Sequence, residues 1–238
     1  MPHLVVTGAA SGIGAAVVHH AETLGWTVAG LDRTYPASDA PDNRFAVDVA
    51  ESGSVTTALR RIVEGWGCAP DALVHAAGVY RVRAATDLDA GGWDDTVGIN
   101  ARGSFLMARA VAAAMIAGGT GGSLVLLGSV AAMRGDSLEP SAAYTASKGA
   151  VGALTRQLAV EWAGAGIRVN SVVPGVIDTA MTTIVGDAAA TEALLQRLPL
   201  GRLGRADEVA AACMFLAGAQ SSYITGTEIV VDGGYLVS

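Results

Sequence analysis

The sequence predicts a three-layer α/β fold, in which helices cover both faces of a doubly wound parallel sheet. Three observations support this fold class. Short apolar runs alternate with stretches of helical spacing, which is typical of strands joined by crossover helices. Of the 238 residues, 51% are hydrophobic and 16% are charged, which is enough to bury a core. No repeat, low-complexity linker or break in composition divides the chain, so we expect a single domain over 1–238.

The first half of the chain is predicted to contain four strands. Short apolar runs, two of which end in glycine, predict these strands at 3–8, 27–32, 45–49 and 71–78. Apolar residues at helical spacing predict the intervening helices at 12–25 and 52–65.

The second half continues the alternation with three further strands. Apolar runs predict strands at 121–129, 166–175 and 227–234. Helices are expected at 93–117, from about Tyr144 to 163, and at 207–217. The stretch 179–200 interrupts this order. We expect there either a flexible substrate flap or an ordinary surface insertion.

Charge and cysteine content limit the possible partners. The net charge is −7 and no run of Lys or Arg exists, so a nucleic-acid partner is not expected. Cys68 and Cys213 are too few for a disulfide or zinc framework, and we expect two buried free thiols and no metal site. There is no leader pattern and no apolar run of membrane-spanning length. These features predict a soluble cytoplasmic protein without a membrane partner.

A glycine-rich loop, TGAASGIG, joins the first strand to the first helix. Glycine lets the backbone turn tightly and approach a pyrophosphate, and the helix N-terminus offers N–H groups to it. The loop residues expected at a dinucleotide are Gly8, Ser11, Gly12, Ile13 and Gly14.

Acidic residues end the second and third strands. A carboxylate at Asp32 can accept both hydroxyls of an adenosine ribose and repels a 2′-phosphate, which favours NAD over NADP. The neighbouring Arg33 leaves NADP open, because an arginine there can hold that phosphate. Asp48, next to Val49, could reach the adenine amino group or could simply form a turn.

Tyr144 and Lys148 share one face of a predicted helix, since they are four residues apart. Lys148 is the only lysine beside fourteen arginines, which suggests a position that arginine cannot fill. An ammonium near a phenol favours the phenolate and is expected to lower its pKa. Tyr144 could then act as a general acid or base toward an alcohol.

Two more polar residues are candidates for the same site. Ser129 follows the fifth strand, at the sheet edge where doubly wound folds bind ligands, and its hydroxyl could hold a substrate oxygen. Asn100 lies in the middle of a predicted helix, where Asn is a poor helix former. It could anchor a water, or it could be a satisfied buried amide.

These motifs, together with AAG, INARG, VNSVVPGVIDT and VDGG, resemble the classical short-chain dehydrogenase/reductase family over nearly the whole chain. The resemblance implies a Rossmann-type fold with a seven-stranded sheet, a nicotinamide cofactor and often a homotetramer. It implies a catalytic tetrad of Asn100, Ser129, Tyr144 and Lys148. It also implies cofactor contacts from Ala76, Ala77, Gly78, Pro174, Gly175, Ile177 and Thr179. The residues expected near the substrate are Tyr80, Ser129, Ala131 and Met181.

The chain departs from the family pattern at two places. His75 stands where the motif usually has Asn, so the turn after the fourth strand is expected to be held differently. Ser129 and Tyr144 are fifteen residues apart (144 − 129), which is longer than usual. The stretch RGDSLEP, 134–140, is therefore expected to form a lengthened loop near the substrate.

The expected activity is NAD(H)-dependent interconversion of a secondary alcohol and a ketone, with a small-molecule substrate. One alternative is an NADPH-dependent 3-oxoacyl carrier-protein reductase, which Asp32 disfavours. Another is a dehydrogenase of dihydroxylated cyclic acids, which the stretch 72–96 loosely resembles. Arg81 or Arg83 would then meet the acid group, although an exposed salt bridge is the favoured role for these arginines. A dinucleotide-sensing protein without activity is the non-enzymatic alternative.

Overall fold

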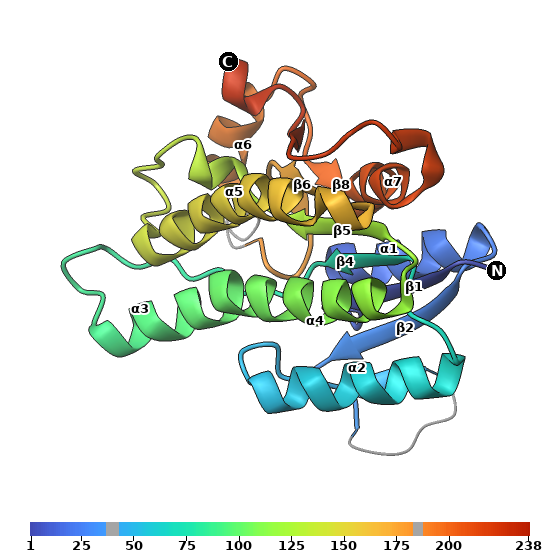
Figure 1. Ribbon diagram of the computed structural model, residues 1–238. Helices are drawn as coiled ribbons and strands as arrows, with labels where there is room; N and C mark the ends of the chain where they lie inside the picture. The colour runs from blue at the N-terminus through green and yellow to red at the C-terminus, as the bar shows by residue number, and fades with distance from the viewer. Residues whose placement is uncertain (37–42, 183–187) are drawn as a thin grey trace.

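The computed structural model describes residues 1–36, 43–182 and 188–238 (Figure 1). Its main sheet has seven parallel strands in the order β3-β2-β1-β4-β5-β6-β9. Their bounds are His3–Thr7 (β1), Thr27–Asp32 (β2), Arg44–Ala46 (β3), Ala72–His75 (β4), Gly122–Leu127 (β5), Ile167–Pro174 (β6) and Glu228–Val231 (β9). The order reverses beside β1, which confirms the predicted doubly wound, Rossmann-type sheet.

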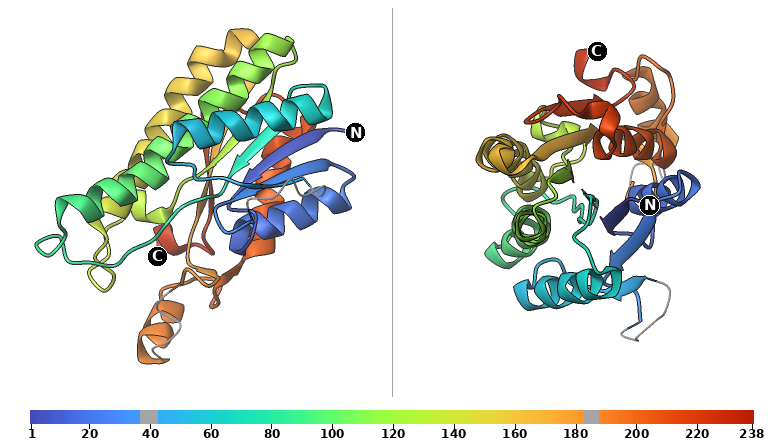
Figure 2. Two further views of the ribbon diagram at one scale, coloured as in Figure 1. Left: turned by 90° about the horizontal axis from the view of Figure 1, so that it is seen from below. Right: turned by 45° about the vertical axis from the view of Figure 1, so that its right-hand side comes forward.

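Helices cover both faces of this sheet, as Figure 2 shows. Residues of α2 (Ser52–Trp66), α4 (Gly103–Gly118) and α5 (Ala142–Trp162) share one buried cluster with the strands. Residues of α1 (Gly12–Thr23) and α7 (Ala206–Ala217) share the cluster on the opposite face. The sheet between these two clusters makes the fold a three-layer one. Within the described ranges, no helix combines the length and apolar composition needed to cross a membrane.

The central strands contribute fully buried side chains to the core. Leu4, Leu73, Leu124 and Leu126 are fully buried, and burial of each such side chain stabilises the fold by about 1.5–3 kcal/mol. Cys213 is fully buried as expected, but Cys68 is only partly buried. This rigid sheet holds the carboxyl ends of its strands at one edge, where the chain leaves the core and forms loops.

Several boundaries differ from the sequence prediction. β3 ends at Ala46 and β4 at His75, and the residues that follow, 47–49 and 76–78, line the cavity described below. The long helix begins earlier than expected, with α3 (Ala90–Val97), and contains a π-helical turn at Gly98–Arg102 before α4.

The segment after β6 contains elements that the sequence did not indicate. A short parallel pair joins β7 (Ile177–Asp178) to β8 (Gly204–Arg205). The segment also contains α6 (Ala188–Gln196), which projects from the body of the domain (Figure 2). Part of the predicted flap, 183–187, lies outside the described residues, so its flexibility stays a prediction.

Candidate active site

A cavity of about 630 Å³ opens at the carboxyl ends of the central strands. Its wall contains the residues expected at the cofactor: Gly8, Ser11, Gly12, Ile13, Gly14, Asp32, Arg33, Asp48, Val49, Ala76, Ala77, Gly78, Pro174, Gly175, Ile177 and Thr179. It also contains those expected at the reacting oxygen and the substrate: Tyr80, Ser129, Ala131, Tyr144, Lys148 and Met181. The structure therefore brings residues from segments that are far apart in the sequence together in one cavity.

The glycine-rich loop forms one end of the cavity. Gly8 has a φ of +67°, and a Cβ atom on it would lie 2.9 Å from the backbone nitrogen of Ala77. A Cβ atom on Gly14 would lie 2.1 Å from the carbonyl oxygen of Gly8. The side chain of Ser11, the N-cap residue of α1, does not cap the helix. The bare loop and the helix N-terminus thus form a cradle that fits a pyrophosphate.

Asp32 lies at the end of β2 and is held in place by its neighbours. Its Oδ2 accepts a hydrogen bond from the Ala10 N–H at 3.1 Å. Its Oδ1 accepts from the Thr34 N–H at 2.9 Å and from the Thr34 hydroxyl at 2.8 Å. These bonds fix a carboxylate in the cavity wall beside the glycine loop, where a ribose would lie.

Asp48 follows β3 and forms a turn, which is one of the two roles that the sequence allowed for it. Its Oδ1 accepts from the Ala50 N–H at 2.9 Å. Its own N–H donates to Ser54 Oγ at 3.1 Å, at the start of α2. The contact with an adenine group stays a prediction.

Tyr144, on the first turn of α5, lies at the other end of the cavity. It makes a hydrogen bond with Ser129, which follows β5. Lys148 lies one helical turn further on, with its Nζ 5.7 Å from the Tyr144 ring centroid. The same Nζ donates to the Leu127 carbonyl at 2.7 Å. The predicted acid–base group is therefore assembled from α5 and the end of β5.

The expected lowering of the Tyr144 pKa is wrong for this arrangement. Burial raises the pKa of Tyr144 above its ordinary value, and the hydrogen bond with Ser129 only partly opposes that effect. The Nζ of Lys148 lies 5.7 Å from the centroid of the Tyr144 ring, and burial lowers the pKa of Lys148 itself to about 8. Removal of the phenol from water thus outweighs the hydrogen bond from which the phenolate would benefit.

Asn100 lies in the π-helical turn, fully buried and outside the cavity lining. Its Nδ2 donates to the Val79 carbonyl at 2.9 Å and to Ser147 Oγ at 3.0 Å. Its Oδ1 accepts from the Val79 N–H at 2.8 Å. The amide is thus satisfied and holds the segment after β4 against α5. A water-anchoring role stays a prediction.

His75 ends β4 and holds the following turn through Thr7. The His75 Nδ1 lies 2.9 Å from Thr7 Oγ1, and that hydroxyl accepts from the Ala77 N–H at 3.1 Å. The Nε2 of His75 is buried without a hydrogen-bond partner. Burial, aided by the charge of Lys148, lowers the pKa of His75 to about 3, so the imidazole is neutral.

We expect His75 to reduce the stability of the fold in acid. Its folded pKa, about 3, lies below the ordinary 6.5. Below pH 6.5 the imidazole of His75 is protonated in the unfolded chain but stays neutral in the folded chain. The free energy of unfolding therefore falls as the pH drops toward 3. Between pH 7 and pH 5 the free energy of unfolding of the wild type should fall by about 2 kcal/mol more than that of a His75→Asn variant. Urea unfolding of both proteins at the two pH values measures it. Equal losses would contradict a neutral His75.

The residues expected at the substrate surround Tyr144. The rings of Tyr80 and Tyr144 meet edge to face, with centroids 4.7 Å apart. The Tyr80 hydroxyl donates to Glu139 Oε2 at 3.1 Å. The Ala131 N–H donates to Ser129 Oγ at 3.1 Å. Met181 is 46% exposed. The loop 134–140 thus contributes to the cavity wall, as its length suggested.

Two cavity residues, Arg134 and Tyr235, carried no signal in the sequence. The guanidinium groups of Arg134 and Arg197 each lie 5.0 Å from the Tyr235 ring centroid. The Tyr235 hydroxyl donates to Asp136 Oδ2 at 3.0 Å and accepts from Arg197 Nη2 at 3.0 Å. The Arg134 side chain donates to the Tyr235 carbonyl at 2.9 Å.

Comparison with known proteins supports the same kind of site. A family model described as enoyl-(acyl carrier protein) reductase matches residues 8–236. D-threitol dehydrogenase of Mycolicibacterium smegmatis is 38% identical, over 98% of this chain and 92% of that protein. The NAD-dependent glycerol dehydrogenase of Listeria innocua is 36% identical, over 98% and 93%.

A solved structure agrees in both fold and sequence. A short-chain type dehydrogenase/reductase from Mycobacterium marinum superimposes with a TM-score of 0.91 and 33% identity, and the match covers 98% of this chain and 95% of that one. The chain therefore belongs to the classical short-chain dehydrogenase/reductase family.

Proposed function

We propose that the protein oxidises a secondary hydroxyl of a small polyol to a ketone, and catalyses the reverse reduction, with NAD as its cofactor. The observation that carries the proposal is the cluster of Tyr144, Ser129 and Lys148 in the same cavity as the glycine-rich loop. The polyol class is supported by relatives that act on threitol and glycerol.

In this proposal Tyr144 transfers the proton and Ser129 orients the substrate oxygen. Burial keeps the phenol protonated, so it can donate a proton to the oxygen that forms when a ketone is reduced. In the oxidation the phenolate must form. The Ser129 hydrogen bond and the Lys148 ammonium then favour the phenolate against the effect of burial.

The remaining residues of the cavity would hold the cofactor. A nicotinamide dinucleotide accepts or supplies the hydride when it is bound. The glycine loop and the N-terminus of α1 would hold its pyrophosphate, and Asp32 its adenosine ribose. An ammonium has three donors, so Lys148 can hold ribose hydroxyls as well as the Leu127 carbonyl. The segment 174–179 would lie along the nicotinamide, and Asn100 would support the site from behind.

Asp32 favours NAD in this arrangement. Its carboxylate is fixed by bonds to Ala10 and Thr34, so it cannot swing away from a 2′-phosphate without losing them. A fixed negative charge repels that phosphate. Arg33 is exposed beside it and is the residue that would favour NADP.

The alternative activities have weaker support. A 3-oxoacyl carrier-protein reductase is consistent with the description of the matching family model. Such an enzyme would use NADPH, however, and the carboxylate of Asp32 would repel the 2′-phosphate of that cofactor. A cyclic hydroxy acid would need a cation such as Arg81, which instead pairs with Asp95. We also propose a homotetramer. Exposed Phe105, Ile116 and Val160 on α4 and α5 support such an assembly, which light scattering would test.

The proposal is tested by turnover of polyols with each cofactor. We expect the protein to reduce NAD⁺ in the presence of D-threitol, glycerol or a related diol, with kcat/KM at least about tenfold higher than with NADP⁺. Absorbance of the reduced cofactor measures both rates. Tight NADH binding without turnover of any alcohol or ketone would instead support a sensing protein.

An Asp32→Ser variant is the matched control for the cofactor. We expect the ratio of kcat/KM for NAD⁺ over NADP⁺ to fall about tenfold or more, because the variant removes the repulsive charge. A wild-type protein that prefers NADP⁺ would show that Arg33, and not Asp32, decides the cofactor.

A further inference from the structure

The substrate end of the cavity contains a carboxylate that the proposed reaction does not use. Glu139 lines the cavity and accepts a hydrogen bond from Tyr80. The ring of Tyr80 in turn contacts the ring of Tyr144. A chain of direct contacts thus runs from Glu139 to the residue proposed to transfer the proton, which places Glu139 within reach of a small substrate.

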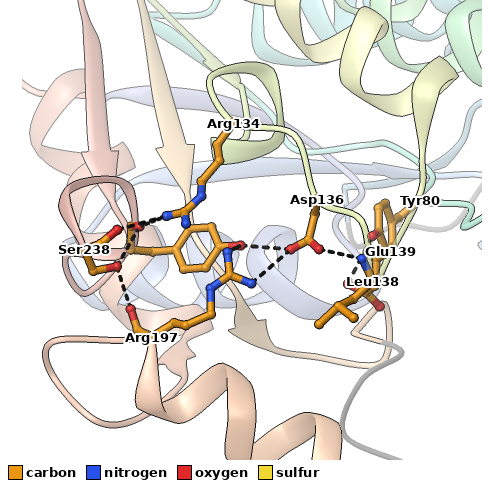
Figure 3. A network of polar contacts seen from close by, with 8 residues as sticks. Tyr80, Arg134, Asp136, Leu138, Glu139, Arg197 and Ser238 are labelled. Atoms are coloured by element: carbon orange, nitrogen blue, oxygen red, sulfur yellow. Dashed lines mark hydrogen bonds and ion pairs between the residues drawn. The ribbon is translucent and has the colours of Figure 1, made fainter.

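The backbone of Glu139 is held by a dedicated network (Figure 3). Asp136 accepts hydrogen bonds from the backbone N–H groups of Leu138, at 2.9 Å, and of Glu139. Asp136 is itself held by the Tyr235 hydroxyl at 3.0 Å, and Arg197 lies 3.7 Å from it. Three segments that are distant in the sequence therefore fix the turn that presents Glu139.

Two other charged side chains of this wall, Arg134 and Asp136, are engaged with Tyr235. Arg134 donates to the Tyr235 and Ser238 carbonyls and stacks on the Tyr235 ring. Asp136 is engaged with Tyr235 and with the turn. Neither is directed to the contact between Tyr80 and Tyr144. Glu139 is the charged residue of this loop that reaches the contact.

The chemistry of the pair suits a hydroxyl ligand. A carboxylate offers about four acceptor positions and Glu139 lines the cavity, so it can accept from several donors at once, a substrate hydroxyl among them. Burial and the nearby Glu139 raise the pKa of Tyr80, so its hydroxyl stays a donor to Glu139 and does not compete as an anion. A substrate carboxylate or phosphate at this place would meet a negative charge instead of a partner.

We propose that Glu139, positioned by Tyr80 and Asp136, accepts a hydrogen bond from a substrate hydroxyl other than the one that is oxidised. The inference rests on the proposed function and narrows its substrate class. Glu139 then selects neutral polyhydroxylated substrates over monohydroxy alcohols of the same skeleton and over hydroxy acids.

The test compares 2,3-butanediol, 2-butanol and 3-hydroxybutyrate in the wild-type protein and in Glu139→Gln. A hydrogen bond to a charged group contributes about tenfold to a hundredfold in affinity. We expect the diol-to-butanol ratio of kcat/KM to fall by about this factor in E139Q, mainly through KM for the diol. We expect turnover of 3-hydroxybutyrate to rise relative to the diol.

Two further variants separate this role from a structural one. Glu161→Gln makes the same change on the exposed surface of α5 and should leave the ratio unaltered. Tyr80→Phe removes the hydrogen bond from Tyr80 to Glu139 and should lower the ratio less than E139Q does. If E139Q does not fold, a lowered ratio in Y80F is the result that supports the inference. An unchanged ratio, or an equal loss for diol and butanol, would overturn the inference while leaving the dehydrogenase proposal intact. A wild-type protein without any alcohol turnover would reject the proposed function first.

Discussion

A Tyr144→Phe variant should lose nearly all turnover while still binding the cofactor. The substitution removes the only atom of the side chain that can carry a proton and keeps the ring that packs against Tyr80. Acid–base catalysis by a positioned side chain contributes about 10²–10⁴-fold, and we expect kcat to fall within or beyond that range. Steady-state rates with a polyol and NAD⁺ measure the effect.

The control for this variant is cofactor affinity. Titration of NADH by its fluorescence should give a Kd within a few fold of the wild type, because the glycine loop and Asp32 are untouched. Thermal unfolding should show that the variant folds. Near-normal turnover in Y144F would remove Tyr144 from the mechanism, and with it the main support for the proposed reaction.

A Lys148→Met variant should be nearly inactive and yet no less stable than the wild type. Burial lowers the pKa of Lys148 from 10.5 to about 8. At pH 7 the amine is charged in both the folded and the unfolded chain, so its burial costs about 3 kcal/mol. Methionine removes this cost but leaves the Leu127 carbonyl unpaired, which costs about 1–3 kcal/mol. The two effects offset each other or leave a net gain in stability.

The pH dependence of unfolding shows whether the buried charge of Lys148 causes the difference in stability. A lysine with a depressed folded pKa destabilises the fold fully below about pH 8, and the penalty fades as the pH rises toward 10.5. The free energy of unfolding of the wild type should therefore rise relative to that of K148M over this range. Below about pH 8, where Lys148 is charged, turnover should fall about a hundredfold or more, since a charge near the reacting group is lost. A variant that is both active and less stable would contradict the assignment of Lys148 to catalysis.

Much of the fold and of the site could be predicted because their signals are local. The alternation of apolar runs and helical spacing indicates the sheet, and the glycine loop has a fixed place between a strand and a helix. Tyr144 and Lys148 are four residues apart on one helix, so their proximity follows from helix geometry. The structure brings them to the same cavity as the loop.

The rest depends on contacts between distant residues. Arg134 contacts Tyr235, which lies 101 residues further along the chain, and no periodicity in the sequence predicts such a pair. The pKa of Tyr144 depends on how burial competes with charge, and neither can be measured along a sequence. The polar character of Asn100 was visible, but its partner Val79 became known only from the structure. The early ends of β3 and β4 likewise depend on where the chain must leave the sheet to surround the cavity.

The single lysine has a practical consequence for following motion at the site. A protease that cleaves only after lysine has one target in this chain, residue 148, which is 7% exposed in the middle of α5. Cutting there requires α5 to open, so the fragments 1–148 and 149–238 would report every local or global opening that exposes the helix carrying Tyr144. Any small molecule that stabilises this helix by binding against it would slow the cut, in proportion to how tightly it binds.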